Sequence, residues 1–200
     1  MDSGGLITLA DWRRRMADLY AAVRREAAGP GAWAGWREGR DGLLGGHAQS
    51  PVPDALRAAF GGMGFFPYDA SWCLVGRVEP THGDVLNAVG AEFTPVGTVV
   101  AERGGDEIRL TLLWSSGYGG GLFLPFGDAT NGAQTYGGGR YLLDQAKGAD
   151  LGVASDGGLI LDFNFAYHPS CAHDPQWTCP LAPAANRLPM AVRAGETAPG

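Results

Sequence analysis

Charged residues are scarce in this sequence. They make up 18% of its 200 residues, and the formal net charge is -6. A chain without a basic excess is not expected to attract nucleic-acid phosphates or an anionic membrane surface. No stretch approaches the ~18 consecutive apolar residues that cross a bilayer, and the first residues lack the basic start and apolar run of a secretory signal. We therefore expect a cytoplasmic protein with neither nucleic acid nor a membrane as partner.

Cysteine is also scarce. The three cysteines are Cys73, Cys171 and Cys179, an odd number in a chain without an expected export signal. Reducing compartments disfavour structural disulfides, so a disulfide framework is not expected to hold this fold together. A bond between Cys171 and Cys179 stays open as an alternative.

Glycine and proline, in contrast, are abundant. The 33 glycines and 13 prolines are scattered between apolar segments, which indicates many tight turns and not a disordered tract. A chain of this length is suited to one domain with one large core. We predict a single domain over residues 1–200, with a helical part at about 8–60 and a β-rich part at about 64–196.

Helical periodicity is confined to the first part of the chain. Thr8 and Asp11 resemble a capping box, and apolar residues then recur at helical spacing until Gly29 and Pro30 end the pattern. The same reasoning predicts a second helix over residues 32–44 and a short third helix over 54–60.

From residue 64 onward, short alternating runs replace the helical spacing. Two β-rich arms flank Gly104, Gly105 and Asp106, which predicts a hairpin. Further strands are predicted over residues 72–78, 121–126, 140–143 and 158–165. The expected fold class is α+β, predominantly antiparallel β in a small barrel or roll, with N-terminal helices that cover one opening or flank.

Several phrases of unusual composition together resemble a known family. The segments HAQSPVP, FFPYD, LPFGDATNGAQTYGGGRYLLD, LDFNFAYHPSCAHDPQWTCPLAPAANRLP and VRAGE occur in the order typical of the bacterial family catalogued as domain of unknown function 1684. The resemblance extends from about residue 36 to residue 196. It implies no activity. The family pattern often has asparagine at the position of His168 and tyrosine at that of His173, whereas both late cysteines match.

His168, Cys171, His173 and Cys179 have the chemistry of a tetrahedral zinc site. Their spacing, H-x2-C-x-H-x5-C, is not that of the common zinc fingers or ribbons. A zinc site has a fixed number of ligands, which fits poorly with histidines that the family pattern often replaces by asparagine or tyrosine. A zinc site, a disulfide and two reduced thiols stay open, and no cofactor or metal is our first expectation.

Residues 137–139 are three glycines, followed by Arg140. The string matches neither the P-loop nor the dinucleotide-binding pattern, so the glycines are better explained by a sharp bend or a close backbone approach. Arg140 could hold a planar anion through its guanidinium fork, or it could neutralise a buried aspartate such as Asp128 or Asp162.

Alternation in LDFNFAY predicts an amphipathic strand. Its polar face would carry Asp162 and Asn164, as the wall of a pocket or as an edge strand exposed to water. We expect a pocket for a small, polar, anionic molecule. The predicted ligand-binding residues are Asp128, Thr130, Thr135, Tyr136, Arg140, Tyr141 and Asn164.

Three functional interpretations follow. The first is a metal-free enzyme in which Asp162 and His47 act as an acid/base pair. The others are a non-catalytic binding module and an interaction protein stabilised by zinc. His82 lacks supporting context and is expected at the surface, and the sequence leaves the oligomeric state open.

Overall fold

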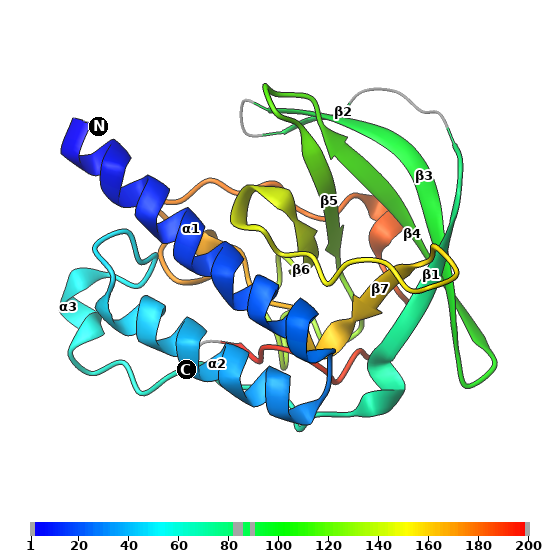
Figure 1. The fold of residues 1–200 in the computed structure, drawn as a ribbon, viewed down its shortest axis with the longest axis horizontal. Coiled ribbons are helices and arrows are strands. Elements are labelled where there is room, and N and C mark those ends of the chain that lie inside the picture. The colour runs from blue at the N-terminus through cyan, green and yellow to red at the C-terminus, as the bar shows by residue number, and fades with distance from the viewer. Residues whose placement is uncertain (1–2, 82–85, 89–90, 199–200) are drawn as a thin grey trace.

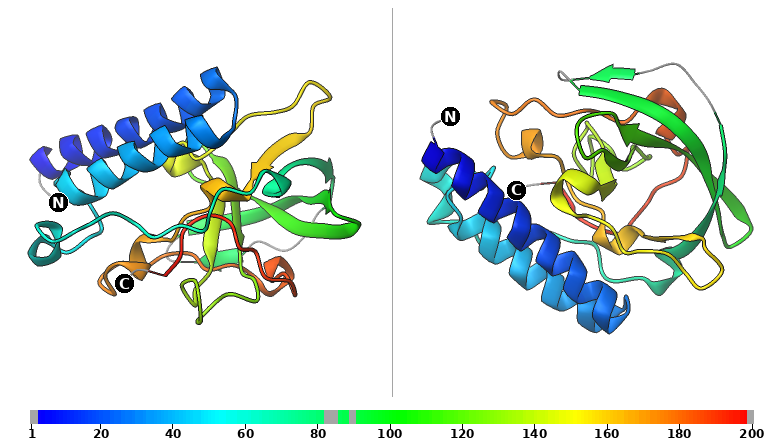
Figure 2. Two further views of the ribbon diagram at one scale, coloured as in Figure 1. Left: turned by 90° about the horizontal axis from the view of Figure 1, so that it is seen from below. Right: turned by 45° about the horizontal axis from the view of Figure 1, so that its top comes forward.

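The chain begins with two long helices that pack side by side. The computed structural model describes residues 3–81, 86–88 and 91–198, so His82 lies outside the described part. The helices are α1 (Ser3–Glu26) and α2 (Pro30–Gly46), followed by the short α3 (Asp54–Arg57). Figures 1 and 2 show α1 and α2 lying together against one flank of the sheet.

The start of α1 differs from the expectation. Thr8 is not a cap, because α1 begins at Ser3 and the Thr8 hydroxyl donates to the carbonyls of Gly4 and Gly5, at 3.1 and 3.0 Å. A threonine inside a helix can satisfy its hydroxyl in this way without ending the helix. The third helix is also shorter than predicted, since it ends at Arg57.

The strands that follow the helices form one antiparallel sheet. Its strands are β1 (Cys73–Glu79), β2 (Leu86–Ala88), β3 (Ala91–Arg103), β4 (Asp106–Ser115), β5 (Gly121–Phe126), β6 (Arg140–Asp144) and β7 (Leu159–Asp162). The order is β6-β5-β4-β3-β1-β7, with β2 paired to β3 beside this path. Gly104 and Gly105 join β3 to β4 with φ of 59° and 91°, the positive values that a two-residue hairpin turn requires. The predicted hairpin and the α+β class are confirmed.

The sheet curls into a half-barrel (Figure 2). An apolar core cluster with residues from six of its strands fills it. Register shifts at Pro95/Gly97 and Leu124/Pro125 are bulges, which bend strands and increase their twist. The curl brings Tyr167, which follows β7 in the chain, against Tyr141 of the opposite edge strand β6. Their backbones exchange two hydrogen bonds of 2.8 and 3.2 Å. The two edges of the half-barrel therefore meet at this tyrosine pair.

The last strand is shorter than predicted. β7 stops at Asp162, and Phe163–Phe165 form a 3-10 turn because the Asp162 carboxylate accepts a hydrogen bond from the Asn164 backbone N–H at 2.9 Å. This local bond offers the backbone an alternative to the sheet. Both phenylalanines and Asn164 are buried. The predicted polar face with Asp162 and Asn164 therefore does not form, and neither residue lies on an edge exposed to water.

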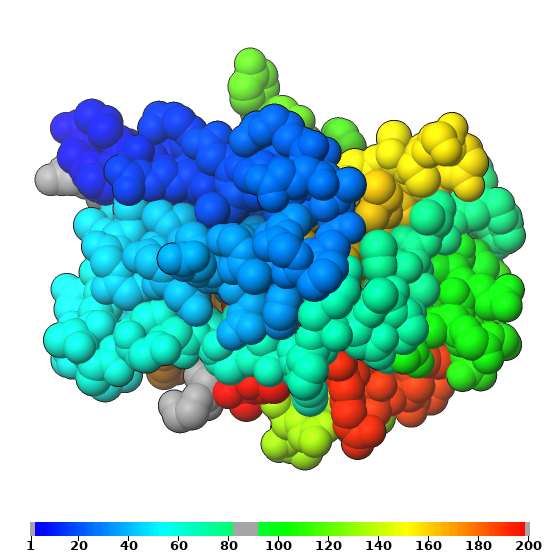
Figure 3. Space-filling model, turned by 60° about the horizontal axis from the view of Figure 1, so that its bottom comes forward, coloured from blue at the N-terminus to red at the C-terminus, as the bar shows by residue number. Residues whose placement is uncertain are grey.

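Figure 3 shows α1, in blue, and α2, in light blue, side by side on one face, with the C-terminal residues, in red, at the lower edge. A second apolar cluster lies between these helices and the sheet and includes Tyr20, Trp36, Phe165 and Tyr167. Within the described residues, no helix is long and apolar enough to cross a membrane.

Candidate functional site

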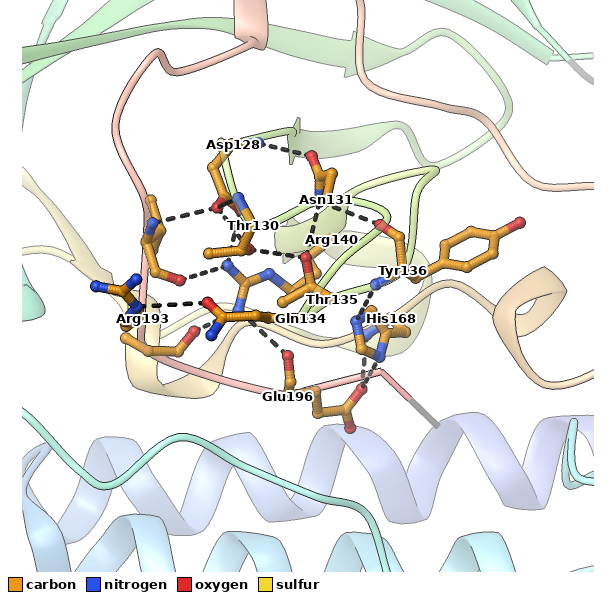
Figure 4. A network of polar contacts seen from close by, with 12 residues as sticks. Asp128, Thr130, Asn131, Gln134, Thr135, Tyr136, Arg140, His168, Arg193 and Glu196 are labelled. Atoms are coloured by element: carbon orange, nitrogen blue, oxygen red, sulfur yellow. Dashed lines mark hydrogen bonds and ion pairs between the residues drawn. The ribbon is translucent and has the colours of Figure 1, made fainter. Parts of the chain in front are cut away.

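Arg140 is the centre of a buried polar network (Figure 4). Its guanidinium pairs with Asp128 at 2.9 Å and donates to the carbonyls of Val192 at 2.8 Å and Glu196 at 3.3 Å, and to the carbonyl of Ala194. The Arg140 side chain has no exposed surface. It therefore ties the turn at Asp128 to the C-terminal segment.

The last glycine before Arg140 allows two backbone segments to approach each other closely. Gly139 has a φ of 89°, and a Cβ there would lie 2.5 Å from the Phe126 carbonyl oxygen. Only glycine fits such a conformation next to another backbone. The close backbone approach expected of the glycines is therefore present at Gly139, directly before Arg140 at the start of β6.

Three more of the predicted residues lie in this network. The Asp128 carboxylate accepts from the Thr130 hydroxyl at 2.6 Å and from the Val192 backbone N–H at 3.2 Å. The hydroxyls of Thr130 and Thr135 are 2.9 Å apart. All these groups are buried and satisfied by one another, as expected of a structural network.

A second buried chain of contacts lies beside the first. Arg40 donates from Nε to Glu196 Oε1 at 2.6 Å, and the backbone N–H of His168 donates to Glu196 Oε2 at 2.7 Å. The Tyr136 backbone N–H donates to His168 Nε2 at 3.2 Å, so the neutral ring carries its proton on Nδ1, 3.5 Å from Glu196. Figure 4 shows the imidazole between Glu196 and Tyr136.

Burial sets the charge states in this chain of contacts. It lowers the pKa of His168 to about 4 despite the nearby Glu196 carboxylate, so the ring is neutral at pH 7. Burial raises the pKa of Glu196, but the charge of Arg40 and the contact with His168 outweigh it and leave the pKa below the usual range. Sequence reasoning missed the Arg40–Glu196 pair, although Arg40 shares the apolar face of Trp33 and Trp36 in α2.

The four residues considered for zinc do not assemble around one point. His168 is committed to Tyr136 and Glu196, while the Cys171 backbone N–H donates to Cys179 Sγ at 3.3 Å. In the described part of the chain, no group of three or more His, Cys, Asp or Glu side chains could hold a metal ion. The zinc interpretation therefore lacks its ligand cluster among these residues, and the His168 ring lies instead between the Tyr136 N–H and the Glu196 carboxylate.

The proposed acid and base lie in separate surroundings. His47 faces Asp11 at 3.3 Å and Trp12 of α1, with ring centroids 5.2 Å apart. Asp162 accepts from the Asn164 side chain at 2.7 Å, and burial raises the Asp162 pKa. Asn164 in turn binds the backbone of Asp69. Since no contact between described residues joins His47 to Asp162, their joint role remains a prediction.

A cavity of about 540 Å³ opens at the end of the half-barrel. We call it the mouth cavity. Residues from the ends of β3 to β6, the turn Gln145–Lys147, α1 and the loop over residues 170–180 line it. Its aromatic lining consists of Phe93, Tyr118, Phe123, Tyr141 and Trp177. Tyr141 is the one predicted ligand-binding residue among the residues described as lining it.

The charged lining of the mouth cavity is predominantly cationic. Lys147 pairs with Asp144 at 2.9 Å, and its ammonium lies 5.4 Å from the centroid of the Tyr141 ring. The same carboxylate oxygen of Asp144 accepts from the Tyr167 hydroxyl at 2.7 Å. Burial raises the Asp144 pKa, but Lys147 and Tyr167 outweigh it and lower the pKa overall. Arg13 of α1, which is exposed, adds a second cation.

The Lys147 ammonium has more N–H donors than acceptors among the described residues. An ammonium group has three N–H donors, and among the described residues Asp144 alone accepts from Lys147. The Asp144 carboxylate, in contrast, is occupied by Lys147, Tyr167 and the Ala146 backbone N–H. The cavity therefore offers unused positive donors beside aromatic rings.

A larger hollow, of about 820 Å³, lies on the outer face of β1, β3 and β4. It is lined by side chains of both charge signs and by the loop over residues 156–158, without an aromatic wall. Its described lining therefore offers no aromatic ring against which a ligand could pack. The mouth cavity is thus the better candidate.

Together these features define a class of protein: a helix-covered antiparallel half-barrel whose edges and C-terminal segment are joined by buried polar networks. The chain belongs to the family described as "Protein of unknown function (DUF1684)", which matches residues 58–197. The solution NMR structure of an uncharacterised protein of Haloarcula marismortui is similar, with 31% identity, a TM-score of 0.57, and coverage of 80% of this chain and 89% of that one. No curated protein matches the chain.

Proposed function

We propose that this protein binds a small organic anion with an aromatic or apolar body in the mouth cavity. The observation that supports it best is the Lys147 ammonium, which lies beside the aromatic lining and has one acceptor among the described residues for its three donors. The anionic group would meet Lys147 and Arg13, and the body would pack against the exposed Trp177 ring.

The size and chemistry of the cavity are consistent with this ligand class. Small-molecule sites range over roughly 300–1,000 Å³ and combine apolar walls with a few polar groups. Charge-assisted hydrogen bonds contribute roughly 1.5–3 kcal/mol each. Because Asp144 is already paired, a ligand carboxylate would not face an unscreened negative group.

Binding of 2-naphthoate is the direct test. We expect it to raise the melting temperature, whereas 2-naphthamide, which has the same body without the charge, should have little effect. Lys147→Gln should weaken naphthoate binding by roughly 10- to 100-fold, because it removes one charge-assisted hydrogen bond. Titration calorimetry measures this ratio of dissociation constants.

Arg25→Gln is the matched control for Arg13→Gln, since both arginines are exposed on α1 and only Arg13 lines the cavity. Arg13→Gln should weaken binding and Arg25→Gln should leave it unchanged. Equal binding of the acid and the amide, or no binding of a panel of aromatic and aliphatic acids, would contradict the proposal.

A further inference from the structure

Two thiols stand next to each other at the edge of the mouth cavity. The Cys171 backbone N–H donates to Cys179 Sγ at 3.3 Å, and the Tyr136 hydroxyl donates to Cys171 Sγ at 3.6 Å. Cys179 lines the cavity. Both cysteines are free and half-buried, so small reagents can reach them.

The loop between the cysteines is folded so as to bring them together. Cys171 lies in the 3-10 turn Ser170–Ala172, and the chain reverses where the Asp174 carboxylate accepts from the Gln176 backbone N–H at 2.9 Å. The Trp177 backbone N–H also donates to the Asp174 carbonyl, at 3.1 Å. The proximity of the thiols is thus part of the loop structure.

The backbone holds the two cysteines close to each other. The Cys171 nitrogen is bonded to its own Cα, so that Cα lies within about 4.8 Å of Cys179 Sγ, given a bond of about 1.46 Å beyond the 3.3 Å contact. Disulfides join cysteines whose Cα atoms are roughly 4.4–6.8 Å apart. The observed contact is compatible with that range.

We propose that Cys171 and Cys179 form a reversible redox pair that is oxidised by low-molecular-weight disulfides. The Cys171 thiolate attacks one sulfur of the reagent, forms a mixed disulfide and releases one thiolate. The Cys179 thiolate then attacks Cys171 Sγ, forms the internal disulfide and releases the second thiolate. Both cysteine protons pass to solvent and then to the released thiolates, so the protein loses two hydrogens and the reagent is reduced to two thiols.

The surroundings assign the order of the two steps. The Tyr136 hydroxyl donates a hydrogen bond to Cys171 Sγ, so this sulfur has a donor beside it. Burial and the neighbouring Cys171 thiol raise the pKa of Cys179, which disfavours that thiolate at the start. Cys171 is therefore the attacking thiol and Cys179 the resolving one. This proposal is independent of ligand binding in the mouth cavity.

Reaction of the reduced protein with glutathione disulfide tests the pair without any cavity ligand. Mass spectrometry of the quenched, digested wild type should show the Cys171–Cys179 disulfide, with glutathione attached to neither residue. Cys179→Ser should instead accumulate glutathione on Cys171. Cys73→Ser, which removes the exposed third cysteine, should still form the internal disulfide as the wild type does.

Circular dichroism of each serine variant checks that its fold is unchanged. A wild type that stops at a glutathione adduct on Cys171, or that reacts at Cys73 while Cys171 and Cys179 stay reduced, would overturn the proposal. The disulfide should also be reopened by excess reduced glutathione; a bond that resists it would contradict reversibility. Failure of naphthoate binding would leave these outcomes unaffected, so the two proposals can fail separately.

Discussion

Replacement of Arg140 by lysine is expected to destabilise the protein by about 3 kcal/mol or more. A buried carbonyl left without its hydrogen-bond donor costs roughly 1–3 kcal/mol, and Arg140 donates to several such carbonyls. Lysine keeps the charge, but it cannot reproduce the planar fork that serves Asp128 and three carbonyls of residues 192–196. Urea unfolding followed by circular dichroism measures the change in the free energy of unfolding.

Arg193→Lys is the matched control for this experiment. Arg193 is exposed on the same C-terminal segment and makes a single side-chain contact of 3.4 Å, to Gln134. Surface changes of this kind usually alter stability by no more than about 0.5 kcal/mol. If Arg140→Lys kept the stability of the wild type and weakened only ligand binding, Arg140 would be a ligand-contacting residue instead of a structural one.

Stability is expected to fall by about 3 kcal/mol between pH 6.5 and pH 4 through His168 alone. Burial lowers the His168 pKa from 6.5 to about 4 in the folded protein. In this window the unfolded chain binds a proton at His168 and the folded protein does not, so acid favours unfolding. Each pKa unit corresponds to roughly 1.4 kcal/mol, which gives this magnitude. Urea unfolding at a series of pH values measures it.

His168→Asn should remove most of this dependence, since asparagine does not titrate. His173, whose pKa is also lowered by burial, would supply the remaining dependence of the same sign. Glu196 acts in a lower window: its pKa is depressed in the folded state, so its contribution is present above the unfolded value and is lost below it. Equal pH profiles for the wild type and His168→Asn would show that His168 is not held neutral by burial.

The candidate site was only partly predictable. The sequence predicts a role for the residues around Arg140, because glycines, threonines and a lone arginine occur close together there, and it allows a structural ion network as that role. The mouth cavity was not found, because its lining comes from Arg13, Phe93, Lys147 and Trp177, which are far apart in the sequence. Each of these residues is ordinary in its own segment.

Local patterns in the sequence determined the helices of the N-terminal part, the antiparallel strands and the hairpin at Gly104 and Gly105. Residue spacing and turn chemistry act over only a few residues. Tertiary structure alone decided that the edges of the half-barrel meet at Tyr141 and Tyr167, and that Arg40 of α2 neutralises Glu196 at the other end of the chain. Such pairings follow from the curl of the sheet and from desolvation of charges in the core. Neither is encoded in the spacing of neighbouring residues.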